Sequence, residues 1–289
     1  MDNFPNWNGL QSVLSESQVS VFFDGTFTEP QLNHPEGIAI DPQGHIWCGG
    51  EKGEIFRIDR DGGTIEQVAS TGGFTLGLAF DSAGYLYSCD LKHAAVFRLN
   101  TATGELIRFA DGDGQGERIR IPNAPVVDEK HGYLYVSDSY HAEQAGPGIW
   151  RFELATGQGR LWCREPMRFA NGLAMSGDGT ALYAAETFGR RIVKIPILPT
   201  GEPGAKQTVV EVNEALPDGV ALDPQGRIYI SCYEPSLLLR WSEAAGLELL
   251  YYDRDAHTLC HPTNCTFRGN DLFVSNLGRW HITRLSDVL

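Results

Sequence analysis

A short apolar phrase recurs along this 289-residue chain, and such a repeat constrains the fold more strongly than any other feature of a sequence. Five copies occupy residues 34–41, 74–81, 121–128, 169–176 and 216–223, and a looser sixth copy occupies residues 261–267. The third residues of the first five copies and Asn264, taken as their equivalent in the looser sixth copy, lie 40, 47, 48, 47 and 46 positions apart; they are Glu36, Leu76, Asn123, Asn171, Asp218 and Asn264. A period of this length is typical of the four-stranded blades of a β-propeller.

Each copy predicts the first strand of a hairpin, because a turn signal containing Gly follows it, as at residues 41–44 (DPQG). Segments that alternate aromatic and β-branched residues follow as second and third strands. The sixth unit ends after its third strand, whereas residues 18–23 alternate without a partner before the first repeat. We therefore predict a single all-β domain over residues 1–289, a six-bladed β-propeller with four-stranded blades. The N-terminal strand joins the C-terminal blade to close the ring, and residues 1–17 are an N-terminal extension.

The charge and the apolar content of the chain exclude several classes of function. With 23 basic and 37 acidic residues the formal net charge is −14, which repels nucleic-acid phosphates and anionic membrane surfaces. No stretch approaches the ~18 apolar residues of a membrane span, and the N-terminus does not resemble a signal peptide. Six scattered cysteines without a Cys-x-x-Cys pair are expected to be reduced core residues. We expect a cytoplasmic protein with no nucleic-acid or membrane partner, and the sequence leaves its oligomeric state open.

The propeller geometry brings the third residues of the six copies together, because the first strand of every blade lines the central axis. Five of these six residues are polar, and two of the five, Glu36 and Asp218, are carboxylates. Carboxylate and amide oxygens with a total charge of −2 are typical ligands of one divalent hard cation. Calcium is our first expectation for this cation, with magnesium, manganese and zinc as alternatives.

Further polar residues are predicted at the same end of the blades, since the second strands run antiparallel to the first strands and end there. Asp90, Asp138, Glu186, Tyr233 and Asn276 stand at these ends, and His34 and His261 precede inner strands. The longest loop on this face covers residues 139–148; its Gly146-Pro147-Gly148 sequence is a candidate hinge, with an irregular loop as the alternative. The predicted substrate-binding residues are Asn123, His34, Glu186, Tyr233, Asn264 and Tyr140.

The repeats Pro35-Glu36-Gly37, Asn171-Gly172-Leu173 and Pro217-Asp218-Gly219-Val220 resemble, in this order and spacing, those of the SMP-30/gluconolactonase/regucalcin-like six-bladed propellers. The resemblance extends over residues 19–285. It implies lactone hydrolysis, with organophosphates as substrates of some relatives. It also implies that Glu36, Asn171 and Asp218 are metal ligands and that Asn123 contacts the substrate or the water on the metal.

The sequence departs from the family pattern near Asn123, where Ile121 replaces an Arg and Ala124 replaces an Asp. Leu76 and the nearby Phe74 also predict a pocket that is more apolar than a polyhydroxylated sugar requires. Aromatic candidates for the same pocket are Tyr140, Phe188, Tyr233 and Trp280. These departures put specificity for sugar lactones in question.

The working hypothesis is a metal-dependent hydrolase that opens a lactone or related ester, with Asp218 as general base and Asn123 as the second catalytic residue. Water activated on the metal and oriented by Asp218 is an open variant of the same scheme. No Gly-x-Ser-x-Gly motif occurs, and no Ser or Cys nucleophile has an obvious His partner, which disfavours covalent catalysis. Two alternatives stay open: a strictosidine-synthase-like, metal-independent lyase or cyclase that uses Glu36 or Glu186, and a non-catalytic calcium-binding propeller.

Overall fold

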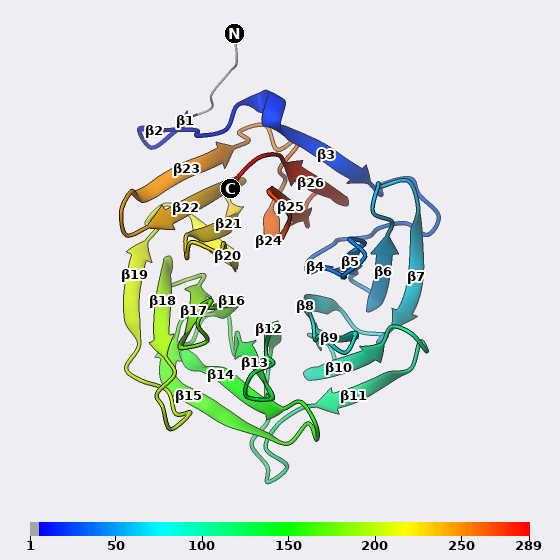
Figure 1. Cartoon of the computed structure of the whole chain (residues 1–289), viewed down its shortest axis with the longest axis vertical. Helices are drawn as coiled ribbons and strands as arrows, with labels where there is room; N and C mark the ends of the chain where they lie inside the picture. The colour runs from blue at the N-terminus through cyan, green and yellow to red at the C-terminus, as the bar shows by residue number, and fades with distance from the viewer. Residues whose placement is uncertain (1–5) are drawn as a thin grey trace.

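The structure is a computed structural model that describes residues 6–289, and it confirms the predicted propeller. Six four-stranded antiparallel sheets surround a central axis as blades, each with its first strand innermost (Figure 1). The first three blades consist of β4 (Ile38–Ile40), β5 (Ile46–Gly49), β6 (Glu54–Ile58) and β7 (Ile65–Ser70); β8 (Thr75–Phe80), β9 (Tyr85–Asp90), β10 (Ala95–Asn100) and β11 (Leu106–Ala110); and β12 (Pro122–Asp128), β13 (Tyr133–Asp138), β14 (Gly146–Glu153) and β15 (Gly159–Met167). The last three consist of β16 (Ala170–Met175), β17 (Ala181–Glu186), β18 (Arg191–Pro196) and β19 (Gln207–Glu211); β20 (Leu216–Leu222), β21 (Ile228–Glu234), β22 (Leu237–Ser242) and β23 (Gly246–Tyr252); and β24 (Pro262–Arg268), β25 (Asp271–Asn276), β26 (His281–Leu285) and β3 (Val19–Asp24).

The N-terminal strand closes the ring as predicted. β3 pairs antiparallel with β26, with Phe23 opposite Ile282 and Val19 opposite Leu285. Figure 1 shows the blue β3 beside the dark red β26, so the two ends of the chain share the sixth blade. Because the outermost strand of that blade comes from the N-terminus, the ring is held together by main-chain hydrogen bonds between distant parts of the sequence.

A short segment precedes β3 and lies outside the ring. It contains the small hairpin of β1 (Asn6–Trp7) and β2 (Leu10–Gln11) and the single 3-10 turn η1 (Glu16–Gln18). Val13 donates its backbone N–H to the carbonyl of Leu249 at 2.9 Å, so this segment runs along β23. The first five residues of the predicted 1–17 extension lie outside the described residues.

The aspartate that ends a copy of the repeat builds the hairpin turn. Asp41 accepts the backbone N–H groups of Gln43 at 3.0 Å and His45 at 2.9 Å through one carboxylate oxygen. Gly44 adopts φ +88°, a conformation that a residue with a Cβ disfavours. Asp223 makes the same two contacts in the fifth blade, so the turn signal in the repeat has a physical cause.

The core is divided among the interfaces between blades. Six apolar clusters occupy the six interfaces between neighbouring blades. In one of them, Leu76 and Tyr87 of the second blade pack against Trp150 and Phe152 of the third. Burial of a large apolar side chain stabilises the fold by about 2 kcal/mol relative to exposure. Because the blade faces carry this burial, the inner strands are free to present other residues along the axis.

A channel of about 400 Å³ runs along part of the axis, and all six inner strands line it. Apolar side chains contribute most of its lining residues, including Ile40, Phe80, Val127 and Leu173. None of the described residues belongs to a helix long and apolar enough to cross a membrane. All six cysteines are free and buried.

The candidate hinge at Gly146 is instead part of a strand. β14 begins at Gly146, which pairs with Met167 of β15. A Cβ at Gly146 would lie 2.1 Å from the ring of Tyr140. The close approach of an aromatic ring therefore explains the glycine. The predicted loop ends before Gly146, and a hinge at this place stays a prediction.

Candidate active site

An irregularity in the inner strands presents the residues of the site. In the second to sixth blades, two consecutive inner-strand residues lack a register partner on the second strand, as between Ala170 and Leu173. A bulge of this kind re-aims a side chain out of the regular pattern. We use the name hub for the first of these two residues in each blade, together with the equivalent Glu36 just before β4: Glu36, Leu76, Asn123, Asn171, Asp218 and Thr263.

The sixth hub residue differs from the one predicted from the repeat. Thr263 occupies the hub position, and Asn264 follows it at a place that glycine or alanine occupies in the other blades. Pro262 is equivalent to Pro122 and Pro217, which directly precede hub residues in their blades. Aligning these prolines would have given the correct register, because each stands at the last paired position before the bulge.

The glycine that follows a hub residue is required by the close approach of neighbouring inner strands. A Cβ at Gly172 would lie 2.4 Å from the carbonyl oxygen of Asp218, and a Cβ at Gly37 would lie 2.1 Å from that of Leu76. Any side chain at these two places would push neighbouring blades apart. The glycines in the repeats therefore bring successive hub residues close together around the axis.

The two hub asparagines are oriented by the same hydrogen-bond relay. Asn123 Nδ2 donates to Ser139 Oγ at 3.1 Å, and Asn171 Nδ2 donates to Thr187 Oγ1 at 3.1 Å. Each hydroxyl in turn donates to a backbone carbonyl of the next inner strand at 2.7 Å. Because the relay fixes Nδ2, the two amide Oδ1 atoms are left buried and without a hydrogen-bond partner.

The sixth blade holds Glu36 of the first blade in place. Asn264 Nδ2 donates to the Glu36 carbonyl at 3.0 Å and to Glu36 Oε2 at 3.2 Å. The hydroxyls of Thr263 and Ser275 each donate to the same carbonyl at 2.7 Å. The hub position in the sixth blade thus serves the neighbouring backbone, and Asn264 contacts a predicted metal ligand.

Glu36 and Asp218 are two buried carboxylates at the hub, with 6% and 7% of their surface exposed. Burial raises the pKa of Glu36 to about 8. Burial also raises the pKa of Asp218, the charge of Glu36 adds to this effect, and a hydrogen bond from Asn171 opposes it. The charge of Glu36 and the amide of Asn171 thus both act on Asp218, and the joint role of the three residues as metal ligands stays a prediction.

The donors of the hub fit a divalent hard cation. Three buried oxygens have no hydrogen-bond partner: Asn123 Oδ1, Asn171 Oδ1 and Asp218 Oδ1. Within residues 6–289, no cationic side chain forms an ion pair with Glu36 or Asp218, and such carboxylates are costly to ionise without a positive partner. Neutral and anionic oxygens are the ligands that calcium and magnesium prefer. In the same described range, no three His, Cys, Asp or Glu side chains gather into a metal-binding group.

The last residue of the second strand ties down the loop that leads into the inner strand. Asp138 accepts the backbone N–H groups of Arg120 at 3.1 Å and Ile121 at 2.9 Å. Asn276 Oδ1 accepts that of Cys260 at 2.8 Å. These side chains are buried and act on the backbone near the site.

Glu186 has the same position in the fourth blade, and its carboxylate is fully occupied by protein partners. It accepts the backbone N–H of Arg168 at 3.1 Å and pairs with Arg191 and Lys206. Burial alone would raise the pKa of Glu186, but the hydrogen bond from Lys206 and those from Arg168 and Arg191 outweigh it and lower this pKa. Substrate binding by Glu186 stays a prediction. In the structure its carboxylate contacts protein groups, and these contacts hold the loop and the neighbouring strands in place.

Three other predicted substrate contacts lie in half-buried positions near the hub. Burial raises the pKa of Tyr233, and the charge of Asp218 adds to this shift. His34 precedes Glu36 by two residues, and its Nδ1 lies 2.8 Å from Glu51 Oε2. Tyr140 follows Ser139 of the relay, and the guanidinium of Arg120 lies 4.2 Å from the centre of its ring.

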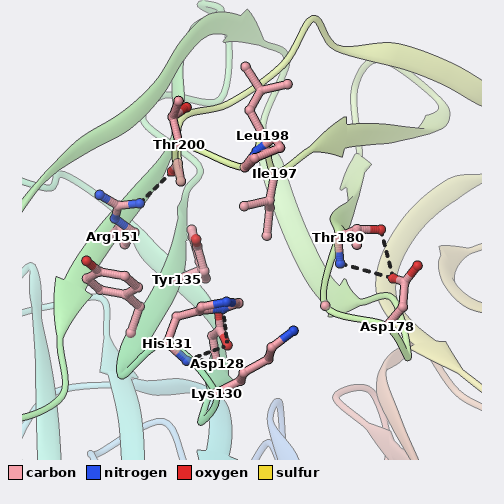
Figure 2. Close-up of a pocket in the computed structure, with 14 residues that line it drawn as sticks. Asp128, Lys130, His131, Tyr135, Arg151, Asp178, Thr180, Ile197, Leu198 and Thr200 are labelled. Carbon is pink, nitrogen blue, oxygen red and sulfur yellow. Dashed lines mark hydrogen bonds and ion pairs between the residues drawn. The ribbon is translucent and has the colours of Figure 1, made fainter.

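A separate hollow of about 440 Å³ lies between the third and fourth blades, as Figure 2 shows. Its residues include Asp128 at the far end of β12 from Asn123, so the hollow belongs to the opposite face. His131 Nδ1 lies 2.8 Å from Asp128 Oδ2, and Arg151 donates to the carbonyl of Gly201 at 2.6 Å. These polar groups are partnered within the protein, so we place the candidate site at the hub.

Sequence reasoning missed the hydroxyls of Ser139 and Thr187, which orient the hub amides. Both directly follow residues that were predicted to end second strands, Asp138 and Glu186. One signal was available in the sequence. In both blades that carry a hub asparagine, a Ser or Thr directly follows the acidic residue at the end of the second strand. In the second blade, where the hub residue is Leu76, the equivalent residue is Leu91.

Comparisons with known proteins agree with this architecture. Residues 75–277 match the SMP-30/Gluconolactonase/LRE-like region, and residues 26–58 match the N-terminal region of strictosidine synthase-like proteins. The curated protein STRICTOSIDINE SYNTHASE-LIKE 6 of Arabidopsis thaliana is 25% identical over 307 residues, covering 88% of this chain and 79% of that protein. Regucalcin of Danio rerio is 26% identical over 110 residues, covering 37% of this chain and 36% of that protein.

Two solved structures have the same fold. A gluconolactonase of Xanthomonas campestris superposes with a TM-score of 0.76 at 21% identity, covering 93% of this chain and 89% of that chain. The calcium-binding protein regucalcin of Agrobacterium tumefaciens superposes with a TM-score of 0.70 at 18% identity, covering 87% and 89%. At these identities the likeness shows the shared propeller. The family match at residues 75–277 covers more than half of this chain, so the chain belongs to the SMP-30/gluconolactonase/LRE-like family.

Proposed function

We propose that the protein is a metal-dependent hydrolase that opens a lactone or a related small ester at the hub. The observation that carries this proposal is the pair of buried carboxylates, Glu36 and Asp218, beside amide oxygens that have no protein partner. Family membership and the gluconolactonase among the structural relatives support a lactone as the substrate class.

Glu36, Asn171 and Asp218 are the residues that would hold the cation. We propose calcium, because these donors are all oxygens and because one structural relative is described as a calcium-binding protein. When bound, the cation would polarise the ester carbonyl and stabilise the negative charge that develops on its oxygen.

Asp218 is the proposed general base. Its Oδ1 has no hydrogen-bond partner in the protein, so this oxygen could take a proton from the attacking water. Asn123 Oδ1 would accept a hydrogen bond from the same water. The amide nitrogen of Asn123 is held by Ser139, and this leaves Oδ1 without a partner in the protein. The water oxygen bonds to the carbonyl carbon, the ring C–O bond breaks, and the proton held at Asp218 passes to the leaving oxygen to give a hydroxy acid.

A second candidate is a metal-independent lyase or cyclase, which the 25% identity to a strictosidine synthase-like protein over 88% of this chain favours. In this scheme Glu36 would act as the acid or base, because Glu186 is engaged by Arg191 and Lys206. The third candidate is a non-catalytic propeller that would bind calcium at the same hub.

One experiment separates the three candidates. The protein is treated with EDTA, dialysed, and assayed by pH-stat against sugar, aliphatic and aromatic lactones before and after calcium is restored. The proposal expects activity only with the cation, and its loss in Asp218→Asn. Activity that survives chelation would favour the metal-independent scheme, and cation binding without turnover of any lactone would favour the binding module.

We also propose a single domain over residues 1–289 and a cytoplasmic location. The apolar clusters between all neighbouring blades support the first proposal, because no blade has a core of its own. The six buried free thiols support the second, since thiols persist in a reducing compartment.

A further inference from the structure

A ring of six equivalent residues next to the hub carries no alcohol, amide or carboxylate side chain. These residues stand two positions before each hub residue, and we call them the collar: His34, Phe74, Ile121, Phe169, Leu216 and His261. Every collar residue is half-buried, whereas every hub residue is buried. The collar is therefore the more exposed of the two rings.

Three collar residues pack their rings against aromatic side chains from neighbouring loops and strands. The pairs are Phe169 with Phe188 at 5.0 Å between ring centres, His34 with Trp280 at 5.0 Å, and His261 with Tyr233 at 4.6 Å. The last pair is stacked, with 27° between the ring planes. Such pairs fix large flat surfaces in place, so the collar is a set of positioned rings.

The collar imidazoles offer few free polar atoms to a ligand. His34 Nδ1 lies beside Glu51 Oε2, and His261 Nδ1 lies 3.1 Å from the carbonyl oxygen of Tyr233. One nitrogen of each ring is thus directed to the protein. The other four collar side chains are hydrocarbon.

The backbone holds the same three residues in a disfavoured conformation. His34, Phe169 and His261 have φ values of 43°, 64° and 48°. This region is uncommon for residues with a bulky side chain, and it persists where the surrounding structure fixes it, often at binding sites. At Phe169 and His261 the fixing contacts are backbone hydrogen bonds, from Thr187 and from Leu277, both at 3.1 Å. At residue 169 the fold thus keeps a phenyl ring although the local backbone disfavours it.

We propose that the collar selects lactones that are fused to, or carry, a flat aromatic or other apolar group, and that it discriminates against polyhydroxylated sugar lactones. This inference rests on the proposed function of the hub. A sugar hydroxyl loses its water at the collar and meets few polar partners there, because four of the six side chains are hydrocarbon and each imidazole directs one nitrogen to the protein. An aromatic ring instead buries apolar surface against the collar rings. Rejection of one additional hydroxyl by an apolar pocket is worth about 100-fold in kcat/KM.

The first test compares two substrates on the calcium-loaded protein. Dihydrocoumarin is an aromatic lactone, and glucono-δ-lactone is a polyhydroxylated lactone with a ring of the same size. We expect kcat/KM to be higher for dihydrocoumarin by about 100-fold or more. An equal or higher kcat/KM for glucono-δ-lactone would overturn the inference while leaving lactone hydrolysis intact.

The second test changes the collar without straining the fold. In Phe169→Asn, the new residue tolerates positive φ better than phenylalanine, so the variant should fold, which thermal unfolding checks. We expect its kcat/KM for dihydrocoumarin to fall by about 10-fold or more and that for glucono-δ-lactone to stay level or rise. Phe27→Asn is the matched control, because Phe27 is 96% exposed and lies outside the collar. Equal losses on both substrates in Phe169→Asn would contradict a role in selectivity.

A binding measurement separates failure of the collar from failure of the hub. Dihydrocarbostyril, the lactam in which N–H replaces the ring oxygen of dihydrocoumarin, resists hydrolysis and is titrated by calorimetry. If neither lactone is hydrolysed, the proposed function fails. In that case, saturable lactam binding that weakens in Phe169→Asn and not in Phe27→Asn still supports the collar, and the absence of such binding overturns it.

Discussion

The second and fourth blades share one backbone and differ in the hub. The inner strands of both are bulged at the same place, and both follow the hub residue with a glycine, Gly77 or Gly172, that lies against a carbonyl of the next blade. The hub residue itself is Leu76 in the second blade and Asn171 in the fourth. The propeller therefore tolerates an apolar hub residue without any change of backbone plan.

The hydroxyl that orients the amide is found only together with the amide in this pair of blades. In the fourth blade, Thr187 Oγ1 accepts a hydrogen bond from Asn171 Nδ2, whereas Leu91 stands at the equivalent place in the second blade. The second blade also leaves the buried hydroxyls of Thr75 and Ser88 without partners. The polar hub and its relay are thus an addition to the fold, as expected for residues that serve a ligand.

Asn171→Leu should have the largest effect on calcium affinity, because it places at the hub of the fourth blade the residue type that the second blade has there. The amide oxygen is lost, so calcium affinity should fall by about 100-fold or more, and kcat/KM should fall with it. Stability should change little, because the lost hydrogen bond to Thr187 is offset by removal of the buried Asn171 Oδ1, which has no protein partner. Calorimetric titration of EDTA-treated protein with calcium measures the first effect, and thermal unfolding measures the second. Wild-type calcium affinity would contradict the assignment of Asn171 as a ligand.

Thr187→Val breaks the relay and keeps the shape of the side chain. The amide donor of Asn171 and the carbonyl of Pro217 lose their partner, so the free energy of unfolding should drop by about 1–3 kcal/mol. Calcium affinity should fall by about 10-fold, because the amide is no longer oriented.

Thr75→Val is the matched control for this change, because the Thr75 hydroxyl is buried without a partner in the second blade. Its unfolding free energy should stay within about 0.5 kcal/mol of the wild type or rise. Urea unfolding of the two variants gives the comparison, and equal losses in both would count against the relay.

Leu76→Asn tests the converse change. The second blade has no hydroxyl at residue 91, so the new amide would be buried without a partner, and the unfolding free energy should drop by about 1–3 kcal/mol. The double variant with Leu91→Ser should recover part of this loss, which a double-mutant cycle measures. Additive losses in the double variant would mean that the hydroxyl does not act through the amide.

Glu186 gives the smallest predicted effect, through the pH dependence of stability. Its folded-state pKa is lowered, so its contribution is complete above the usual pKa of a glutamate and is lost as the pH falls through the lower, folded-state value. The wild type should therefore lose unfolding free energy between about pH 5 and pH 3 more steeply than Glu186→Gln, whose amide does not titrate. Urea unfolding across this range measures both slopes, and parallel curves would show that Glu186 is not stabilised as an anion.

The repeat was sufficient to predict the six blades, the closing strand and five of the six hub residues. It was sufficient because hydrophobic alternation and turn signals are local, and because circular closure then places equivalent residues at one height. The sixth hub residue was predicted one position late, as Asn264 instead of Thr263, because the last copy of the repeat is irregular. A slip of one residue changes the face on which a strand side chain lies.

The relay and the contacts of the collar were beyond reach of the sequence for a different reason. Ser139 and Thr187 act on a carbonyl of the neighbouring blade, so their role depends on how two blades are packed. Phe74 and Tyr233 were recognised singly as apolar or aromatic candidates. The six collar residues are the first residues of the six copies of the repeat, but their ring contacts and the positive φ of Phe169 are visible only in the structure.

The central claim is that Glu36, Asn171 and Asp218 hold one divalent cation, and anomalous diffraction tests it most directly. Crystals of the protein grown with manganese chloride would be measured at the manganese absorption edge. We predict a strong anomalous peak on the propeller axis within about 2.3 Å of oxygens from all three side chains. A map without a peak among these oxygens, from crystals saturated with manganese, would contradict the account.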